Sequence, residues 1–153
     1  MLGSLEELNC GKNSLTALDI SQNQALTDLD CSECGLTSLD VSNNPALEML
    51  WCADNQLTTL DVSNNPELSL LECANNQLIS LDLAANTKLS ALNCSGNQLT
   101  TLDLTLNINL WYLVLKDMPT LTRVCVWEIP FPSMSGLDLE GSPNAYLTTE
   151  CNR

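Results

Sequence analysis

The sequence predicts a mostly β protein, a parallel solenoid with two short strands in each 21-residue coil and a loop-rich C-terminal cap. Three observations support this fold class: a repeat period, alternating apolar residues and a low aromatic content. The period is visible in two columns, cysteine at Cys10, Cys31, Cys52, Cys73 and Cys94, and leucine at Leu8, Leu29, Leu50, Leu71, Leu92 and Leu113. A fixed period of this length is typical of coils that stack on their neighbours.

Each repeat contains the same pattern twice, and each copy predicts a short strand. In the third repeat the first copy has Leu47, Leu50, Cys52 and Asn55, and the second has Leu57, Leu60, Val62 and Asn65. Apolar residues two positions apart place one face of a strand in the core. We therefore expect parallel strands on two sides of a flattened tube. An aromatic content of only 4% fits such thin coils, whose core is built from Leu, Val and Cys.

The repeats divide the chain into three parts. Five repeats begin at Leu5, Leu26, Leu47, Leu68 and Leu89 and cover residues 5–109. Residues 1–4 form a tail, and residues 110–153 form a divergent last coil and the cap, where Pro and Gly turns end the regular pattern. The tail carries no recognisable cap of its own, so we expect a longer parent protein to continue upstream.

The chain is strongly acidic. It has 19 acidic and 5 basic residues, a net charge of −14, and no basic residue from Asn13 to Thr87. Such a surface repels nucleic acid and anionic lipid, and no run of 18 apolar residues predicts membrane insertion. Basic proteins, metal ions and neutral glycans remain as partners. The acidity also has a simpler explanation, since charge keeps stacked strands from self-association and so favours a monomer.

Asparagine ends both halves of the repeats. The columns are Asn13, Asn55, Asn76 and Asn97 in the first half, and Asn23, Asn44, Asn65, Asn86 and Asn107 in the second. An inward amide can donate to and accept from main-chain groups of the neighbouring coil where the strand ladder stops. The cysteine column is predicted to be buried with free thiols, because stacked residues lie ~4.8 Å apart and a disulfide needs Cβ atoms at about 3.8 Å.

Two patterns could indicate metal chemistry, and both favour a structural role. Cys31-Ser-Glu-Cys34 has the CxxC spacing of redox and metal motifs, but Cys34 takes an Asn position and the chain has no His and no second CxxC. The Asp column offers calcium one carboxylate per coil, whereas calcium prefers clustered oxygens. Hydroxyl groups of neighbouring Ser residues or turn amides could relieve its repulsion instead. The column consists of Asp19, Asp40, Asp61, Asp82 and Asp103.

The sequence gives no support for catalysis. It contains no His, no nucleophile motif and no phosphate-binding loop. We therefore expect no enzyme activity, no catalytic residue, no metal ligand and no cofactor.

The cap is predicted to hold a disulfide. Cys125 takes an outward position equivalent to the Asp column, displaced by the inserted Met118-Pro-Thr. It can therefore meet Cys151 as the tail folds back over the last coil. A disulfide at this place implies an oxidising, extracellular environment.

The nested pattern LxxLxCxxNxLxxLDVxxN resembles the 21-residue irregular class of bacterial leucine-rich repeats, sometimes called IRREKO. The resemblance covers roughly two thirds of the chain and repeats five times. The segments VCVWEIPFP and GSPNAYLTTEC resemble tails that follow such repeats in secreted bacterial proteins. The family implies a right-handed parallel solenoid that acts as an extracellular or surface-attached interaction module. Cys34 in an Asn column and Ile79 in a Thr column depart from the pattern.

The outward residues of the first strand vary between repeats, whereas those of the second strand are uniform. Met49, Trp51 and Leu70 form an apolar patch rimmed by Asp28, Asp30, Asp54 and Glu72, and Tyr112 and Val114 continue the same face. An aromatic centre inside a polar ring is the composition of an interface hot spot. Scattered apolar residues are also ordinary on protein surfaces, so the patch has a neutral explanation as well.

We therefore expect a non-enzymatic module, secreted or on a bacterial cell surface, that holds a basic protein partner on the face around Trp51. A glycan-binding module is the alternative, because a sugar ring could stack on Trp51 while Asp30 and Glu72 accept hydrogen bonds from its hydroxyls. A glycosidase is disfavoured, since two rungs separate these acids by ~9.6 Å and the strand surface is flat.

Overall fold

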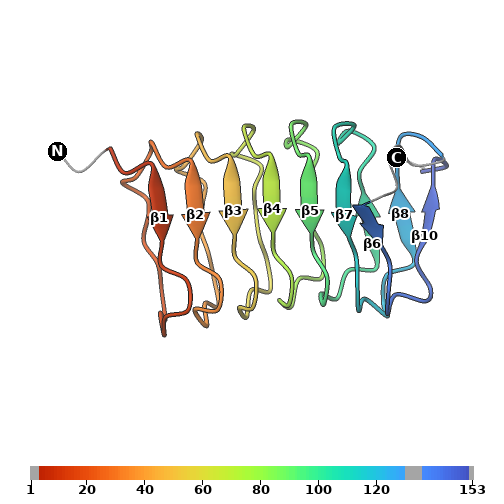
Figure 1. Cartoon of the computed structure of the whole chain (residues 1–153), viewed down its shortest axis with the longest axis horizontal. Helices are drawn as coiled ribbons and strands as arrows, with labels where there is room; N and C mark the ends of the chain where they lie inside the picture. The colour runs from red at the N-terminus through yellow and green to blue at the C-terminus, as the bar shows by residue number, and fades with distance from the viewer. Residues whose placement is uncertain (1–3, 130–135, 152–153) are drawn as a thin grey trace.

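The first halves of the repeats form one long parallel sheet. The structure, a computed structural model, describes residues 4–129 and 136–151. The sheet has the order β1-β2-β3-β4-β5-β7-β9, and its strands follow one another along the long axis of the molecule (Figure 1). Its strands are β1 (Glu7–Asn9), β2 (Asp28–Asp30), β3 (Met49–Trp51), β4 (Leu70–Glu72), β5 (Ala91–Asn93), β7 (Tyr112–Val114) and β9 (Leu137–Asp138). Leu29 pairs with Leu50 and Leu50 with Leu71, which confirms the parallel solenoid with a 21-residue register.

The second halves form strands only in the last coils. A second parallel sheet has the order β10-β8-β6, with β6 (Thr101–Asp103), β8 (Arg123–Cys125) and β10 (Tyr146–Thr148). In the first four repeats the described second halves belong to no strand. There the Gln56 amide donates to the Leu36 carbonyl at 2.8 Å. This is the single main-chain hydrogen bond found between the second halves of the second and third repeats, and one bond does not make a strand ladder. These coils therefore have one strand rather than the expected two.

Loops make up the remainder of the described chain. Within residues 4–129 and 136–151, no helix has the length and apolar character needed to cross a bilayer.

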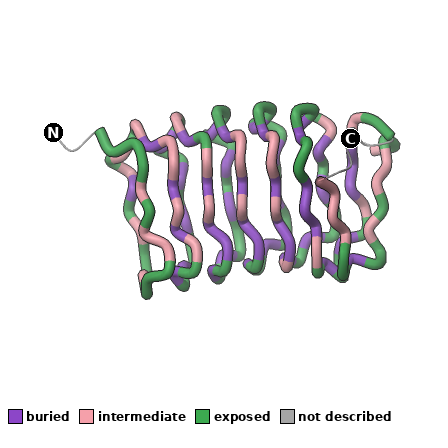
Figure 2. The backbone as a smooth tube through the Cα atoms, in the orientation of Figure 1, coloured by how far each residue is buried: buried purple, intermediate pink, exposed green. Residues whose placement is uncertain are grey.

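The interior is a continuous column of leucines and cysteines. Leu50 and Cys52 are fully buried, and Figure 2 shows buried residues recurring from coil to coil. The predicted free thiols are confirmed for the whole column, and the predicted burial is confirmed for Cys31, Cys52, Cys73 and Cys94. Cys10 was also expected to be buried but is only half-buried, because no described coil packs on the N-terminal side of its own. Burial is the main cause that raises the pKa of the Cys31 and Cys94 thiols to about 12. Such thiols stay protonated at neutral pH and react slowly with oxidants.

Buried asparagines tie each coil to the one before it. The Asn55 Nδ2 group donates to the Cys31 carbonyl at 3.0 Å, and its Oδ1 atom accepts from the Leu36 amide at 2.9 Å. Asn65 is also buried, and its Nδ2 group donates to the Val41 carbonyl at 3.0 Å. Among the described residues, no donor reaches the Oδ1 atoms of Asn44, Asn65, Asn86 and Asn107. The expected double role is therefore confirmed for the buried first column, whereas the second column only donates.

The cap continues both sheets and is closed by the predicted disulfide. β9 pairs with β7, and β10 pairs with β8. Cys125 lies beside Asp103 of the preceding coil and forms a disulfide with Cys151. Lys116 adds ion pairs to Asp138 and Glu140, each at 2.9 Å.

Substitutions at two adjacent positions test the inward and outward assignment. Leu60 is 7% exposed, and its neighbour Thr59 is exposed. Leu60→Asp should lower the free energy of unfolding by about 4 kcal/mol, since it buries an unpaired charge among leucines. Thr59→Asp should change it by less than about 1 kcal/mol. Thermal unfolding followed by circular dichroism measures both variants, and equal melting temperatures would contradict the assignment.

The disulfide should contribute to stability by closing a loop with a sequence separation of 26 residues. Chain-entropy arithmetic for a loop of this length gives about 3.5 kcal/mol. Cys151→Ser should therefore lower the urea midpoint of unfolding, and a reducing agent should lower the wild-type midpoint to the same value. The reducing agent should leave the Cys151→Ser midpoint unchanged. A wild-type midpoint that does not respond to reduction would show that loop closure contributes nothing.

Candidate interaction face

The first-strand face, defined as the outward side of β1 to β5 and β7, carries most of the predicted contact residues in two rows. Asp28, Met49 and Leu70 are ladder neighbours in one row, and Asp30, Trp51 and Glu72 are neighbours in the other. All six side chains are half-buried. Directly opposite side chains in neighbouring strands pack against one another, so each row forms a continuous strip across three coils. The predicted apolar centre and its acidic neighbours are thus brought together.

Trp51 separates two shallow hollows on this face. The acidic hollow has a volume of about 370 Å³ and is lined by Glu7, Leu8, Asn9, Asp28, Asp30 and Trp51. The aromatic hollow has a volume of about 230 Å³ and is lined by Trp51, Leu70, Leu71, Glu72, Ala91, Leu92, Asn93, Trp111 and Tyr112. The face is therefore negatively charged toward its N-terminal end and mainly apolar toward its C-terminal end.

Trp111 is a residue of this face that the sequence reasoning missed. It is 57% exposed beside Tyr112, which is 40% exposed, and the two ring centroids lie 5.9 Å apart. Trp111 immediately precedes β7, at the position held by Ser69 and Ser90 in the two preceding coils. The alternation of inward and outward residues applies only within a strand. It therefore makes no prediction for a residue that immediately precedes a strand. The replacement of a small polar residue by Trp was the available signal.

Glu72 is a half-buried carboxylate at the edge of the aromatic hollow. Burial, the largest influence, raises the pKa of its carboxyl group, and the negative charge of Asp54 acts in the same direction. The Asn93 Nδ2 group opposes this shift by donating to Oε2 at 3.0 Å. The face therefore contains a carboxylate that is harder to ionise than an exposed one and is held in a fixed direction.

Two predicted contact residues differ from the six in the rows. Asp54 is exposed in the turn after β3, with a φ of 56°, and its Oδ1 atom accepts from Asn75 Nδ2 at 2.9 Å. It therefore stabilises the rim of the face. Val114 was expected to continue the exposed face but is only 9% exposed, between Asn93 and Asp138 of the neighbouring strands. Little of its side chain is available to a partner.

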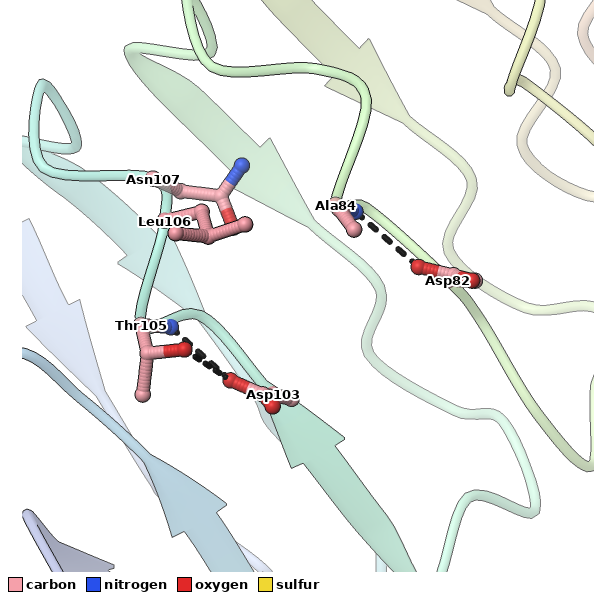
Figure 3. Close-up of a pocket in the computed structure, with 6 residues that line it drawn as sticks. All are labelled: Asp82, Ala84, Asp103, Thr105, Leu106 and Asn107. Atoms are coloured by element: carbon pink, nitrogen blue, oxygen red, sulfur yellow. Dashed lines mark hydrogen bonds between the residues drawn. The ribbon is translucent and has the colours of Figure 1, made fainter. Parts of the chain in front are cut away.

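The second halves of the repeats carry the Asp column, whose carboxylates bond to their own turns. Asp82 Oδ1 accepts from the Ala84 amide at 3.0 Å beside a hollow of about 300 Å³ (Figure 3). Hydrogen bonds from Ser63, chiefly from its hydroxyl group, lower the pKa of Asp61. The expected relief of the aligned charges by Ser and turn amides is confirmed. Residues 4–129 and 136–151 contain no group of three or more His, Cys, Asp or Glu side chains placed to hold a metal ion.

No protein-family model and no curated protein sequence matches the chain, whereas solved structures do. The functional domain of InlJ from Listeria monocytogenes, which includes a cysteine ladder, matches 92% of this chain and 45% of its own at 28% identity and TM-score 0.56. Internalin C2 from Listeria monocytogenes matches 96% of this chain and 63% of its own at 24% identity and TM-score 0.70. A leucine-rich-repeat protein from Leptospira interrogans is similar over 94% of this chain and 50% of its own chain, at 23% identity and TM-score 0.65.

The chain has a leucine-rich-repeat fold. This leucine-rich-repeat chain spans between 45% and 63% of the length of the three similar structures. This chain has a column of free cysteines, and the InlJ domain includes a cysteine ladder. Membership of the irregular 21-residue class stays a prediction.

The variant Glu72→Gln tests whether burial raises the pKa of the Glu72 carboxyl group. A carboxyl group with a raised folded-state pKa binds its proton more tightly in the folded state. Stability therefore falls as the pH rises from the ordinary Glu value of 4.5 through the folded pKa. The variant lacks this fall. The difference in unfolding free energy, variant minus wild type, should therefore be larger at pH 7 than at pH 4.

Urea unfolding at both pH values measures this difference. Glu48→Gln, which removes an exposed carboxylate just before β3, is the control for the loss of one negative charge. A Glu72→Gln difference that is the same at both pH values would contradict the effect of burial.

Proposed function

We propose that the chain is a non-enzymatic leucine-rich-repeat module that binds a protein partner on the first-strand face. The observation that carries this proposal is Trp51, half-buried at the centre of a varied face and shared by two hollows. A tryptophan fixed by its neighbours loses little freedom on binding and contributes a large apolar area. The second halves, by contrast, use Asp40 and Asp61 to bond their own turns.

The dimensions of the face favour a macromolecule over a small molecule. The hollows together extend from β1 to β7, and six strands at ~4.8 Å spacing make a face about 24 Å long. A protein contact of standard size needs a surface of this extent. Sites for small molecules enclose most of the ligand, whereas both hollows here are shallow and open.

The module is proposed to act outside the cytoplasm, secreted or at a bacterial cell surface, in partner capture or adhesion. The Cys125–Cys151 disulfide supports this location, since such bonds persist in oxidising compartments. The buried cysteine column is compatible with it, because protonated, covered thiols resist oxidation. The similar proteins from Listeria and Leptospira are bacterial, which supports the bacterial part of this proposal.

A glycan-binding module is the second candidate. It is favoured by the row in which Trp51 lies directly between Asp30 and Glu72. A sugar ring could stack on the indole while the flanking carboxylates accept hydrogen bonds from its hydroxyls. The Asn93 bond to Glu72 already occupies part of this acceptor capacity, so the protein partner is preferred.

The test compares Trp51→Ser with Ile79→Ser, which removes an apolar side chain that is 65% exposed in the second half of its repeat. Wild type and both variants are applied to an array of purified secreted and surface proteins, and to a glycan array. The wild type should bind at least one protein, Trp51→Ser should bind it about 30-fold more weakly, and Ile79→Ser should bind as wild type does.

Binding to glycans alone, lost in Trp51→Ser, would favour the second candidate. Equal losses of protein binding in the two variants would contradict the proposed use of the first-strand face.

A further inference from the structure

We infer that the first-strand face receives a basic and apolar segment of its protein partner. A lysine or arginine of that segment lies in the acidic hollow, and a large apolar side chain lies in the aromatic hollow, about 12 Å away. This inference rests on the proposed function and adds the chemistry of the partner to it.

The acidic hollow combines three carboxylates with an indole, and no Lys or Arg is among the described residues that line it. Glu7, Asp28 and Asp30 line it together with Trp51. The ion pairs of the described chain lie elsewhere, joining Lys12 to Glu33, Lys88 to Glu67, and Lys116 to Asp138 and Glu140. A lysine or arginine from a partner would therefore meet unneutralised negative charge. Its aliphatic stem and charged head could also cover the indole of Trp51.

The arrangement of these carboxylates suits an organic cation better than a metal ion. Asp28 Oδ2 accepts from the Thr27 hydroxyl at 2.6 Å, and Asp30 Oδ1 accepts from the Ser32 amide at 3.0 Å. Each carboxylate is thus fixed locally and keeps further acceptor positions. No metal-binding group of three or more His, Cys, Asp or Glu occurs within the described ranges. The several N–H donors of an ammonium or guanidinium group match such separated acceptors.

The aromatic hollow suits a large apolar side chain. Trp51, Leu70 and Tyr112 supply apolar walls, and Trp111 extends them toward the solvent. Aromatic residues of this kind are enriched at the centres of protein interfaces. At its edge the Asn93 donor is already paired, because Asn93 Nδ2 donates to Glu72 Oε2 at 3.0 Å. A partner can therefore cover this edge without leaving the Asn93 donor unpaired.

The separation of the hollows sets the spacing of the two partner side chains. The acidic hollow spans β1 to β3 and the aromatic hollow spans β3 to β7, so their centres lie about two and a half strand spacings, or ~12 Å, apart. An extended segment rises ~3.3 Å per residue, which gives a spacing of about four residues, and an even spacing points both side chains to one side. A helical segment rises ~1.5 Å per residue and gives a spacing of about eight.

A random dodecapeptide library displayed on phage and selected against the wild-type chain tests this inference. The recovered peptides should be enriched in Lys or Arg together with a large apolar residue, at a spacing of four or of seven to eight positions. The most enriched peptide, made synthetically, is then titrated by calorimetry against wild type and variants at two salt concentrations.

The variants separate the two hollows from the rest of the surface. The double variant Asp28→Asn, Asp30→Asn keeps an acceptor oxygen for the hydrogen bonds from Thr27 and Ser32. It should bind the peptide about five-fold more weakly than wild type, with a smaller salt dependence. The matched pair Asp40→Asn and Asp61→Asn removes the same charge from the second halves, keeps the bonds from their turns and should bind as wild type does. Trp111→Ala should weaken binding about 30-fold.

The possible failures are distinguishable. Peptides that lose binding in Trp51→Ser but show no basic preference would overturn the inference and leave the proposed function standing. Peptides that bind every first-strand variant as tightly as wild type would count against the proposed function as well. A selection without enrichment, or equal weakening by the two double Asn variants, would overturn the inference.

Discussion

Register between coils is the constraint on which the rest of this molecule depends. Side chains 21 residues apart share one environment, as Leu50 and Leu71 do in neighbouring strands. The strands are only three residues long, so the ladder alone fixes little of each coil. Asn55 and Asn76 extend the connection beyond the strands by bonding to main-chain groups of the preceding coil. A shift of one residue would leave these buried groups without partners, which costs free energy at every rung.

The same register aligns like charges, and the two halves of the repeat resolve this in different ways. In the second half, a carboxylate such as Asp61 bonds to its own turn, which lowers its pKa and lets identical residues stack. In the first half the rows change residue at each rung, as Asp30, Trp51 and Glu72 do. Burial raises the pKa of Glu72, the opposite direction from Asp61. Uniform columns thus serve stacking, and the varied rows are those that we propose for recognition.

Periodicity was sufficient to predict the parts of this fold that repeat. Alternation placed Leu50 and Cys52 in the core and Trp51 between them on the face, as observed. The displaced spacing of the last coil placed Cys125 where it meets Cys151. Both results follow from counting positions, because neighbours in a solenoid are set by the period.

Features that depend on the distance between particular side chains or main-chain groups could not be read from the pattern. The second halves of the early coils are apolar and extended enough to suggest strands, yet strand pairing needs several amides to reach the next coil. Val114 occupies an outward position but is only 9% exposed, at a point where β9, outside the regular repeats, continues the sheet. Trp111 lies before its strand, where a rule about alternation within strands has nothing to say.

Scalar couplings across main-chain hydrogen bonds, measured by NMR, test the register most directly. The structure places the Cys52 amide 2.8 Å from the Glu72 carbonyl and the Cys73 amide 2.9 Å from the Asn93 carbonyl. Correlations should therefore join each of these amides to the carbonyl carbon of that residue in the following coil. Correlations shifted by one residue, or directed to a carbonyl within the same repeat, would contradict the stacking of coils at a 21-residue period.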